Sequence, residues 1–314
     1  MKRKRFAGKT LLLTLTAMLV AAPAFAALHW PWPDTSKHPR VILYADQNMA
    51  TDFKEHPDWF AKDFVVAGFY ISKVVYGQSD EAIRMYGYLH QKFIYNKIYL
   101  GSYMSATTVI HELSLTKYPA DAVSMEELSP KTKLLGPWMR DGTHQVVDLT
   151  DPASRKDLQN NIHLLWAHVP VQLRFLDNAA VHPRVAAGQP WAAYCANMKE
   201  LRKLAEYTDA NTMFNVFVRP WEMSDEETKQ LIDAVGWGNA VSLPLPWSKS
   251  IKDDKNANAW AIYRYRQMLK AGLAIVLVPS DDAPEEALVH WVSTWKQKGD
   301  HIYYAFPEWK APTL

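Results

Sequence analysis

The sequence predicts an α/β fold, a single-domain (β/α)8 TIM barrel, and three observations predict it. Short apolar runs alternate with helical patterns from residue 40 to residue 306. Eight such runs can be counted. Several of them are followed directly by an acidic, aromatic or amide residue, as expected where parallel strands end together at one rim.

The eight predicted strands are short apolar runs bounded by polar or turn-forming residues. The sixth stops at its prolines, because proline cannot donate to a sheet ladder. The strands cover residues 40–46, 63–71, 97–104, 169–177, 211–218, 239–247, 273–279 and 301–306.

The predicted helices fill the intervals between the strands. Asp151 or Thr150 is expected to cap the third helix, and Ser224 with Glu227 forms a capping box before the fifth. Gly272 and Gly299 close the last two helices. The helices cover residues 48–60, 80–93, 151–168, 191–207, 228–235, 256–271 and 284–297.

Residues 105–147 are longer than a usual connection and are predicted to be an insertion after the third strand. One interpretation places the insertion over the barrel mouth, where it covers or contacts a ligand. The other interpretation is that the insertion only packs against the rest of the fold and has no role in binding.

Residues 1–26 have the pattern of a secretory signal peptide: basic residues 2–5, an apolar stretch, and a small-x-small cleavage site that ends at Ala26. A membrane anchor is the alternative, but the stretch is short and is broken by Pro23. We therefore expect a periplasmic or secreted protein, residues 27–314, without a stable membrane anchor after cleavage.

Loss of the five basic residues in the signal peptide lowers the formal net charge from +2 to about −3. Nothing electrostatic therefore favours a nucleic-acid partner. The lone cysteine, Cys195, lies in a helical pattern and is expected to be a buried structural thiol, so no internal disulfide is possible. No spacing of ligand residues suggests a metal site, and no phosphate or dinucleotide motif suggests a cofactor.

The chemistry is expected at the strand ends, and Asp177 is the main candidate. It follows a mostly apolar run, so a rigid strand holds it, and Asn178 is expected to orient it. Carboxylates with tryptophan and tyrosine around one opening are typical of a carbohydrate cleft. The further candidates for substrate binding after the other strands are Asp46, Tyr103, Trp221, Trp247 and Asp281.

Each candidate also has an ordinary structural interpretation. Asp46 and Asp282 can cap the helices that follow them, and Glu222 can be a solvated residue ahead of the capping box. His182 is expected at the surface. Arg174 lies within its strand, and the sequence does not decide which way it faces.

Four segments carry a resemblance to a known family: 63–68, 97–103, 147–155 and 175–178. Over about residues 40–308 the chain resembles bacterial glycoside hydrolases with a TIM-barrel-like domain, relatives of the endo-α-1,4-polygalactosaminidases. The resemblance implies an exported (β/α)8 enzyme without a cofactor that acts on glycosidic bonds of a polysaccharide or oligosaccharide. It also implies a carboxylate at the position of Asp177.

Such enzymes pair that carboxylate with a second one on a later strand, but the sixth strand here offers no acid. The partner is Glu222, Asp281, or absent. We expect Asp177 to act as nucleophile or base and Glu222 to act as proton donor. Glu222 is chosen as the donor because its apolar neighbours Trp221 and Pro220 favour the protonated form of its carboxyl group. The alternative is a non-catalytic carbohydrate-binding barrel that assists exopolysaccharide handling. Another hydrolase or a lyase on the same scaffold is a third possibility.

Overall fold

The computed structural model describes residues 32, 40–45, 66–70, 99–104, 108–110, 123–124, 133–137, 144–156, 172–185, 189–206, 210–244, 255–278 and 285–306. Side chains are not described at residues 42–45, 66–70, 99–104, 108–110, 123–124, 137, 144–145, 178, 285 and 306.

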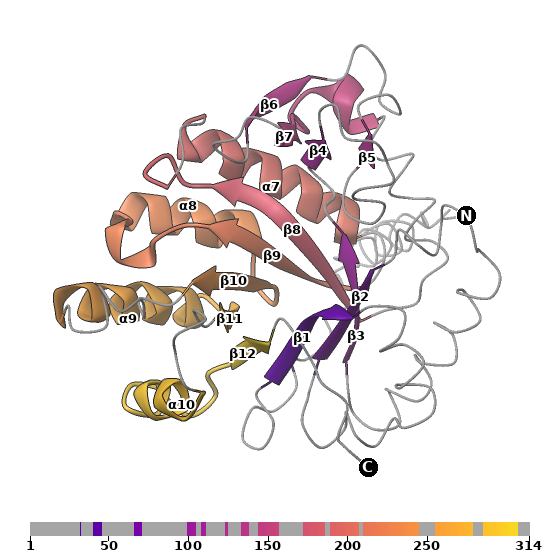
Figure 1. Ribbon diagram of the computed structural model, residues 1–314. Coiled ribbons are helices and arrows are strands. Elements are labelled where there is room, and N and C mark those ends of the chain that lie inside the picture. The colour runs from indigo at the N-terminus through magenta and orange to yellow at the C-terminus, as the bar shows by residue number, and fades with distance from the viewer. Residues whose placement is uncertain are drawn as a thin grey trace, which may run out of the picture.

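A parallel, curled sheet forms the centre of the molecule, and helices cover its outer side (Figure 1). All neighbouring strands of this sheet run parallel, and β1 pairs with both β2 and β12. The order is therefore β1-β12-β11-β10-β9-β8-β3-β2, without a free edge. The strands are β1 (Arg40–Ala45), β2 (Val66–Tyr70), β3 (Tyr99–Met104), β8 (Leu173–Val181), β9 (Asn211–Phe217), β10 (Ala240–Pro244), β11 (Ala274–Val278) and β12 (Ile302–Phe306).

The predicted α/β class and the eight predicted strands are confirmed. Each strand falls within or overlaps its predicted range. The helices expected after the first two strands, residues 48–60 and 80–93, lie outside the described residues. The complete alternation of a (β/α)8 barrel therefore stays a prediction.

Four helices follow strands β8 to β11 and pack on the outer face of the sheet (Figure 1). They are α7 (Trp191–Glu206), α8 (Asp225–Val235), α9 (Lys255–Lys270) and α10 (Glu285–Ser293), and a short 3-10 turn, η2 (Pro220–Glu222), precedes α8. Most bounds agree with the predictions. Helix α10 ends earlier than predicted because the chain turns at residues 294–295.

The capping box that the sequence predicted is present at the start of α8. The Ser224 hydroxyl accepts from the Glu227 N–H at 3.2 Å, and the Glu227 carboxylate accepts from the Ser224 N–H at 2.7 Å. Helix α8 starts three residues earlier than predicted because the capped turn itself is helical.

We predict that Ser224→Ala lowers the free energy of unfolding by about 1 kcal/mol, because it leaves a helix N–H without its acceptor. Urea unfolding at neutral pH measures this. Ser224→Thr keeps the hydroxyl and is expected to retain most of the stability. Equal loss in the two variants would contradict the capping role.

The core has two parts because alternate strand residues point to opposite faces. Outward-facing residues such as Phe214, Val241 and Ile275 pack with the helices in one cluster. Inward-facing residues form a second, smaller apolar cluster, which we call the inner cluster. Its members are Trp32, Val41, Leu173, Phe175, Met213, Ala240, Ala274, Val276, Tyr303 and Ala305.

Trp32 belongs to the inner cluster, although the sequence predicted only an extended lead-in around it. Its indole N–H donates to the Gly238 carbonyl at 2.9 Å, and its ring lies 5.4 Å from that of Tyr303. Gly238 lies two residues before the start of β10 at Ala240. Trp32 therefore fills the inner cluster at the N-terminal end of the strands.

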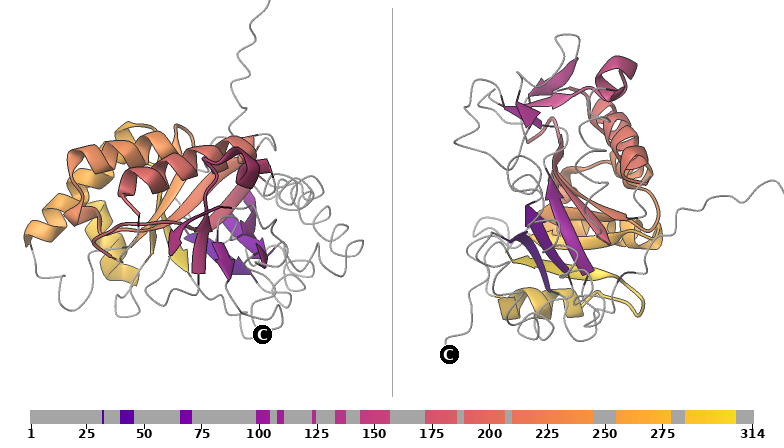
Figure 2. Two further views of the ribbon diagram at one scale, coloured as in Figure 1. Left: turned by 90° about the horizontal axis from the view of Figure 1, so that it is seen from above. Right: turned by 90° about the vertical axis from the view of Figure 1, so that its right-hand side faces the viewer.

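The predicted insertion after β3 contains a second, four-stranded sheet with the order β5-β4-β7-β6. Its strands are β4 (Thr108–Ile110), β5 (Val123–Ser124), β6 (Leu134–Pro137) and β7 (His144–Val147). Both figures show this small sheet beside α7 (Figures 1 and 2).

One buried side chain, Asn197 of α7, joins the small sheet to the helix layer. Its amide oxygen accepts from the Leu149 N–H at 2.6 Å, and its amide nitrogen donates to the Val147 carbonyl at 2.9 Å. The described end of the insertion thus has a packing role beside the first turns of α7. Beyond it, Asp151 caps the helical residues 152–156, as predicted, by accepting from the Ser154 N–H at 3.0 Å.

Candidate functional site

Asp177 lies inside β8, not at its end as the sequence predicted. The strand continues to Val181, and its pairing with β9 shifts register between Leu176 and Ala180. More residues of β8 than of β9 occupy this interval, so the strand bulges directly after Leu176. Such bulges redirect side chains, and they are common beside functional sites.

Asp177 belongs to the inner face of the sheet. Leu173 and Phe175 on the same strand face the inner cluster, whereas Leu176 faces the helices, so alternation places Asp177 inward. Its side chain is only 7% exposed. Burial of a carboxylate costs free energy unless hydrogen bonds or opposite charges compensate for it.

Asn215 of β9 supplies such a hydrogen bond. Its side-chain amide nitrogen donates to Asp177 Oδ1 at 2.5 Å. An ionised carboxylate only accepts hydrogen bonds, so the amide nitrogen, not the amide oxygen, must face Asp177. The contact requires that both side chains leave their strands on the inner face.

Ser242 of β10 extends the same row. It lies opposite Asn215 in the β9–β10 register, and it alternates with Val241 and Leu243, which face the helices. Ser242 is fully buried, and its hydroxyl makes no hydrogen bond. An unsatisfied buried polar group costs about 1–3 kcal/mol, so this hydroxyl needs an explanation.

The floor beneath this row is apolar. Phe175, Met213 and Ala240 precede Asp177, Asn215 and Ser242 by two residues on their strands, and all three belong to the inner cluster. Phe217 follows Asn215 by two residues and is 38% exposed. The polar row therefore lies between an apolar floor and the partly open C-terminal ends of the strands.

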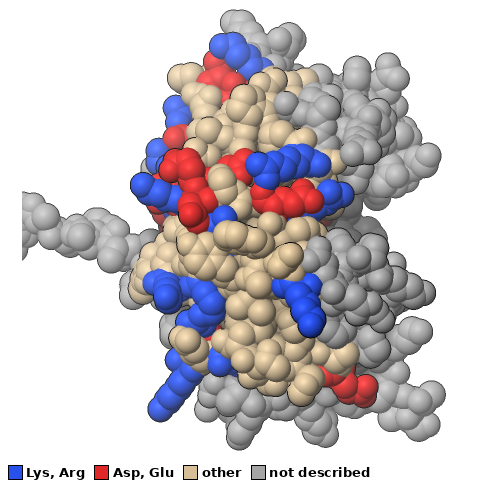
Figure 3. Space-filling view, turned by 90° about the vertical axis from the view of Figure 1, so that its left-hand side faces the viewer, with Lys and Arg blue, Asp and Glu red and all other residues tan. Residues whose placement is uncertain are grey.

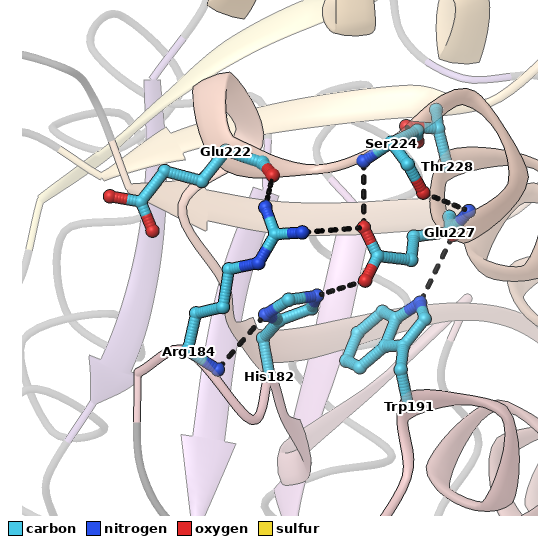
Figure 4. A network of polar contacts seen from close by, with 7 residues as sticks. All are labelled: His182, Arg184, Trp191, Glu222, Ser224, Glu227 and Thr228. Atoms are coloured by element: carbon cyan, nitrogen blue, oxygen red, sulfur yellow. Dashed lines mark hydrogen bonds and ion pairs between the residues drawn. The ribbon is translucent and has the colours of Figure 1, made fainter.

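Glu222, the predicted proton donor, lies in η2 after β9. Its Oε1 accepts from Arg219 at 3.2 Å, and its backbone carbonyl accepts from the Arg184 guanidinium. Its carboxylate points away from the neighbouring His182–Glu227 pair (Figure 4). The neighbouring Trp221 is half-buried and packs against the outer core cluster. The ion pair with Arg219 was not predicted, because the prediction for Glu222 was based only on its apolar neighbours.

The prediction that His182 lies at the surface is wrong. The residue is 2% exposed, and its Nε2 lies 3.1 Å from Glu227 Oε1 (Figure 4). The Arg184 backbone N–H donates to His182 Nδ1 at 3.2 Å. Because Nδ1 accepts, Nε2 carries the proton of the neutral ring and donates to Glu227.

Glu227 connects the loop after β8 to the start of α8. Besides His182, its carboxylate binds the Ser224 N–H, and its backbone carbonyl accepts from the Trp191 indole at 3.0 Å (Figure 4). Burial would raise the pKa of Glu227, but the hydrogen bonds from Ser224 and His182 outweigh this effect and lower the pKa. We interpret the cluster as structural support for the rim.

Burial lowers the pKa of His182 below its ordinary value of 6.5, and Arg184 acts in the same direction. Glu227 and Glu222 oppose this effect without overcoming it. Below pH 6.5 the unfolded chain therefore binds more protons at this residue than the folded protein does. The stabilisation is present above pH 6.5 and is lost as the pH falls from 6.5 through the lower pKa of the folded protein.

We predict that the free energy of unfolding decreases between about pH 7 and pH 5, and that His182→Gln shows a shallower decrease. Urea unfolding at a series of pH values measures both slopes. His290→Gln, at an exposed position of α10, is the matched control and should leave the slope unchanged. Equal slopes in wild type and His182→Gln would contradict this interpretation.

The other predicted site residues have different outcomes. Asp46, Trp247 and Asp281 lie outside the described residues. The structure describes only the backbone of Tyr103 and Asn178: Tyr103 is in register with Phe175, and Asn178 lies in the bulge of β8. The contacts of these five side chains therefore lie outside the described part of the structure.

Arg174 faces away from the site. It is 2% exposed and is in register with Ser102 and Thr212, between the inward-facing residues Leu173 and Phe175. Strand alternation therefore places it on the outer face, opposite Asp177. This decides the question that the sequence left open.

Asn215 and Ser242 were not predicted as site residues. Both are visible in the sequence as single polar residues at alternate positions within apolar strands, which is the signal that could have found them. They were not predicted because they lie within strands, whereas the predicted site residues follow strands.

The prediction that Cys195 is a buried thiol is confirmed. Its side chain is 3% exposed within α7, and burial raises the pKa of the thiol. Among the described residues, no three histidine, cysteine, aspartate or glutamate side chains are grouped to hold a metal ion.

The fold and site together define an α/β protein with a curled parallel sheet and a buried carboxylate on the inner face of that sheet. The catalytic domain of β-amylase from Paenibacillus polymyxa has a similar fold: the alignment covers 85% of this chain and 91% of that chain, with 6% identity and a TM-score of 0.50.

Two other solved structures align less well. Ega3 of Aspergillus fumigatus, in complex with galactosamine, aligns over 88% of this chain and 92% of its own, with 8% identity and a TM-score of 0.47. An α-galactosidase of Thermus thermophilus aligns over 88% and 59%, with 12% identity and a TM-score of 0.48. No protein-family model matches the sequence, and no curated protein sequence matches it. The comparisons therefore concern the fold alone.

Proposed function

We propose that this protein is an exported glycoside hydrolase with a (β/α)8 barrel, which cleaves a polysaccharide by carboxylate chemistry. The continuous parallel strand order and the outer helices support the barrel. The resemblance in sequence supports the substrate class, and the signal-peptide pattern of residues 1–26 supports export.

The observation that carries the proposal is the buried Asp177 on the inner face. A carboxylate in this position is costly, and a bulge redirects its strand at this point. The inner face near the C-terminal ends of barrel strands is where enzymes of this architecture place their reacting groups. A carboxylate there can act as nucleophile or base on a glycosidic bond.

Glu222 is the proposed proton donor, and Asp281 is the alternative partner. Two carboxyl groups about 5 Å apart would give retention of configuration at the sugar carbon, and a wider separation would give inversion. Arg219 must release Glu222 in the complex with substrate, since a proton donor has to be protonated before it reacts.

A polysaccharide or oligosaccharide is the proposed partner. On the face drawn in Figure 3, acidic and basic side chains lie beside each other in the upper half, and uncharged residues fill much of the centre. Nucleic-acid binding would favour a continuous basic surface. Within the described ranges, no helix is long and apolar enough to cross a membrane.

A non-catalytic carbohydrate-binding barrel is the second candidate. The ion pair between Glu222 and Arg219 favours it, because that pair occupies the carboxylate proposed as proton donor. Such a protein would bind oligosaccharides at the same inner face but release no product.

The test is release of reducing ends from a panel of bacterial exopolysaccharides, with the mature protein and a heat-denatured sample as control. The hydrolase proposal expects new reducing ends and oligosaccharides in the product mass spectrum. Binding of a polysaccharide without release of product over days would overturn it and support the binding barrel.

A further inference from the structure

Three polar side chains occupy the inner face of three consecutive strands at one level. Asp177 is on β8, Asn215 on β9 and Ser242 on β10, and we call them the inner row. Asn215 is the register partner of Ser242, and it bonds Asp177 directly. Adjacent strands lie about 4.8 Å apart, so the three side chains are close neighbours.

The hydrogen bond to Asp177 determines how Asn215 is oriented. Its amide nitrogen faces the carboxylate on β8, so its amide oxygen is directed away from that carboxylate. Within the described residues, Asp177 is the side chain to which Asn215 bonds. The amide oxygen is thus left as an acceptor beside Ser242.

Ser242 provides the complementary group. Its hydroxyl is buried and without a partner, so both its donor and its acceptor functions are unused. Ser242 itself has no exposed surface, whereas the neighbouring Asn215 is half-buried, so a ligand hydroxyl must enter past Asn215 to reach Ser242. A group that both donates and accepts would satisfy the two residues together.

We propose that Asn215 and Ser242 form a binding subsite for one neutral hydroxyl group of a sugar, next to Asp177. The sugar hydroxyl donates to Asn215 Oδ1 and accepts from the Ser242 hydroxyl. Asn215 is also a positioning residue, because its amide nitrogen holds Asp177 Oδ1. The choice of a sugar rests on the proposed function, whereas the hydroxyl-binding geometry rests on the inner row alone.

The experiment is an NMR titration of the 15N-labelled protein with glycerol, glucose, galactose and N-acetylglucosamine, followed through the side-chain amide signals of Asn215. At least one probe is expected to shift these signals. Ser242→Ala is expected to weaken binding of that probe about fivefold to tenfold, which is the loss of one neutral hydrogen bond.

Thr212→Val is the matched control. Thr212 carries another buried hydroxyl without a partner, but on the outer face of β9, so its removal should leave binding unchanged. Ser242→Ala should fold as well as wild type, because it removes a hydroxyl that makes no bond in the ligand-free protein. Thermal unfolding of both variants checks this.

The subsite is overturned if no probe shifts the Asn215 signals. It is also overturned if Ser242→Ala binds the probe as tightly as wild type, or if Thr212→Val weakens binding equally. Neither readout involves turnover. Weakened binding in Ser242→Ala without release of reducing ends would therefore refute the hydrolase and leave the subsite standing.

Discussion

Replacement of Asp177 with asparagine is expected to lower polysaccharide hydrolysis on the order of a thousandfold or more, while the protein remains folded. Asparagine has almost the same shape as aspartate and keeps an oxygen that accepts from Asn215, so the hydrogen bond across β8 and β9 survives. The substitution removes the charge and the basicity that a nucleophile or base needs. Initial rates of reducing-end release, with far-UV circular dichroism as a check on folding, measure the effect.

Glu226→Gln is the matched control for the same chemical change. Glu226 is an exposed carboxylate on α8, so the rate should stay within a factor of two of wild type. Undiminished turnover by Asp177→Asn would remove Asp177 from the catalytic site. A parallel loss in Glu226→Gln would indicate a general effect of charge instead.

Replacement of Asn197 with leucine is expected to lower the free energy of unfolding by about 3 kcal/mol. Asn197 is fully buried and binds one backbone donor and one backbone acceptor, those of Leu149 and Val147. Leucine has a similar volume but leaves both backbone groups buried without a partner. Since domains are stable by only about 5–15 kcal/mol, the change is a large fraction of the total.

Urea unfolding at neutral pH measures this loss, and Gln230→Leu serves as control. Gln230 is an amide on α8 whose bond to Glu226, at 3.3 Å, is exposed, so its replacement should change stability by less than about 0.5 kcal/mol. Similar values for the two variants would show that Asn197 does not join the small sheet to α7.

The order and positions of the central strands were predictable from the sequence because strands buried on both faces appear as short apolar runs. Residues 273–279, for example, are a nearly continuous apolar segment, and this segment contains strand β11 of the curled sheet. Helix starts were predictable where a local hydrogen bond defines them, as with Ser224 and Glu227. Cys195 was correctly expected to be buried because a thiol without polar helpers behaves as a small apolar side chain.

The site was less predictable. The sequence located Asp177 but not its position inside a bulged strand, and it did not identify the partner Asn215. His182 was misjudged because a histidine in a loop gives no local sign of burial. Its partner Glu227 lies on a later helix.

Apolar periodicity and local caps depend on neighbours along the chain, so the α/β class, the strand ranges and the candidate Asp177 could be deduced from residue order. Which polar groups meet is a matter of register across separate strands, which residue order does not specify. The pairing of β8 with β9 and β10 brought Asp177, Asn215 and Ser242 into one row, and it turned Arg174 to the other face. Only the tertiary structure determines those contacts, because each joins groups that are far apart in the chain and adjacent only in the sheet.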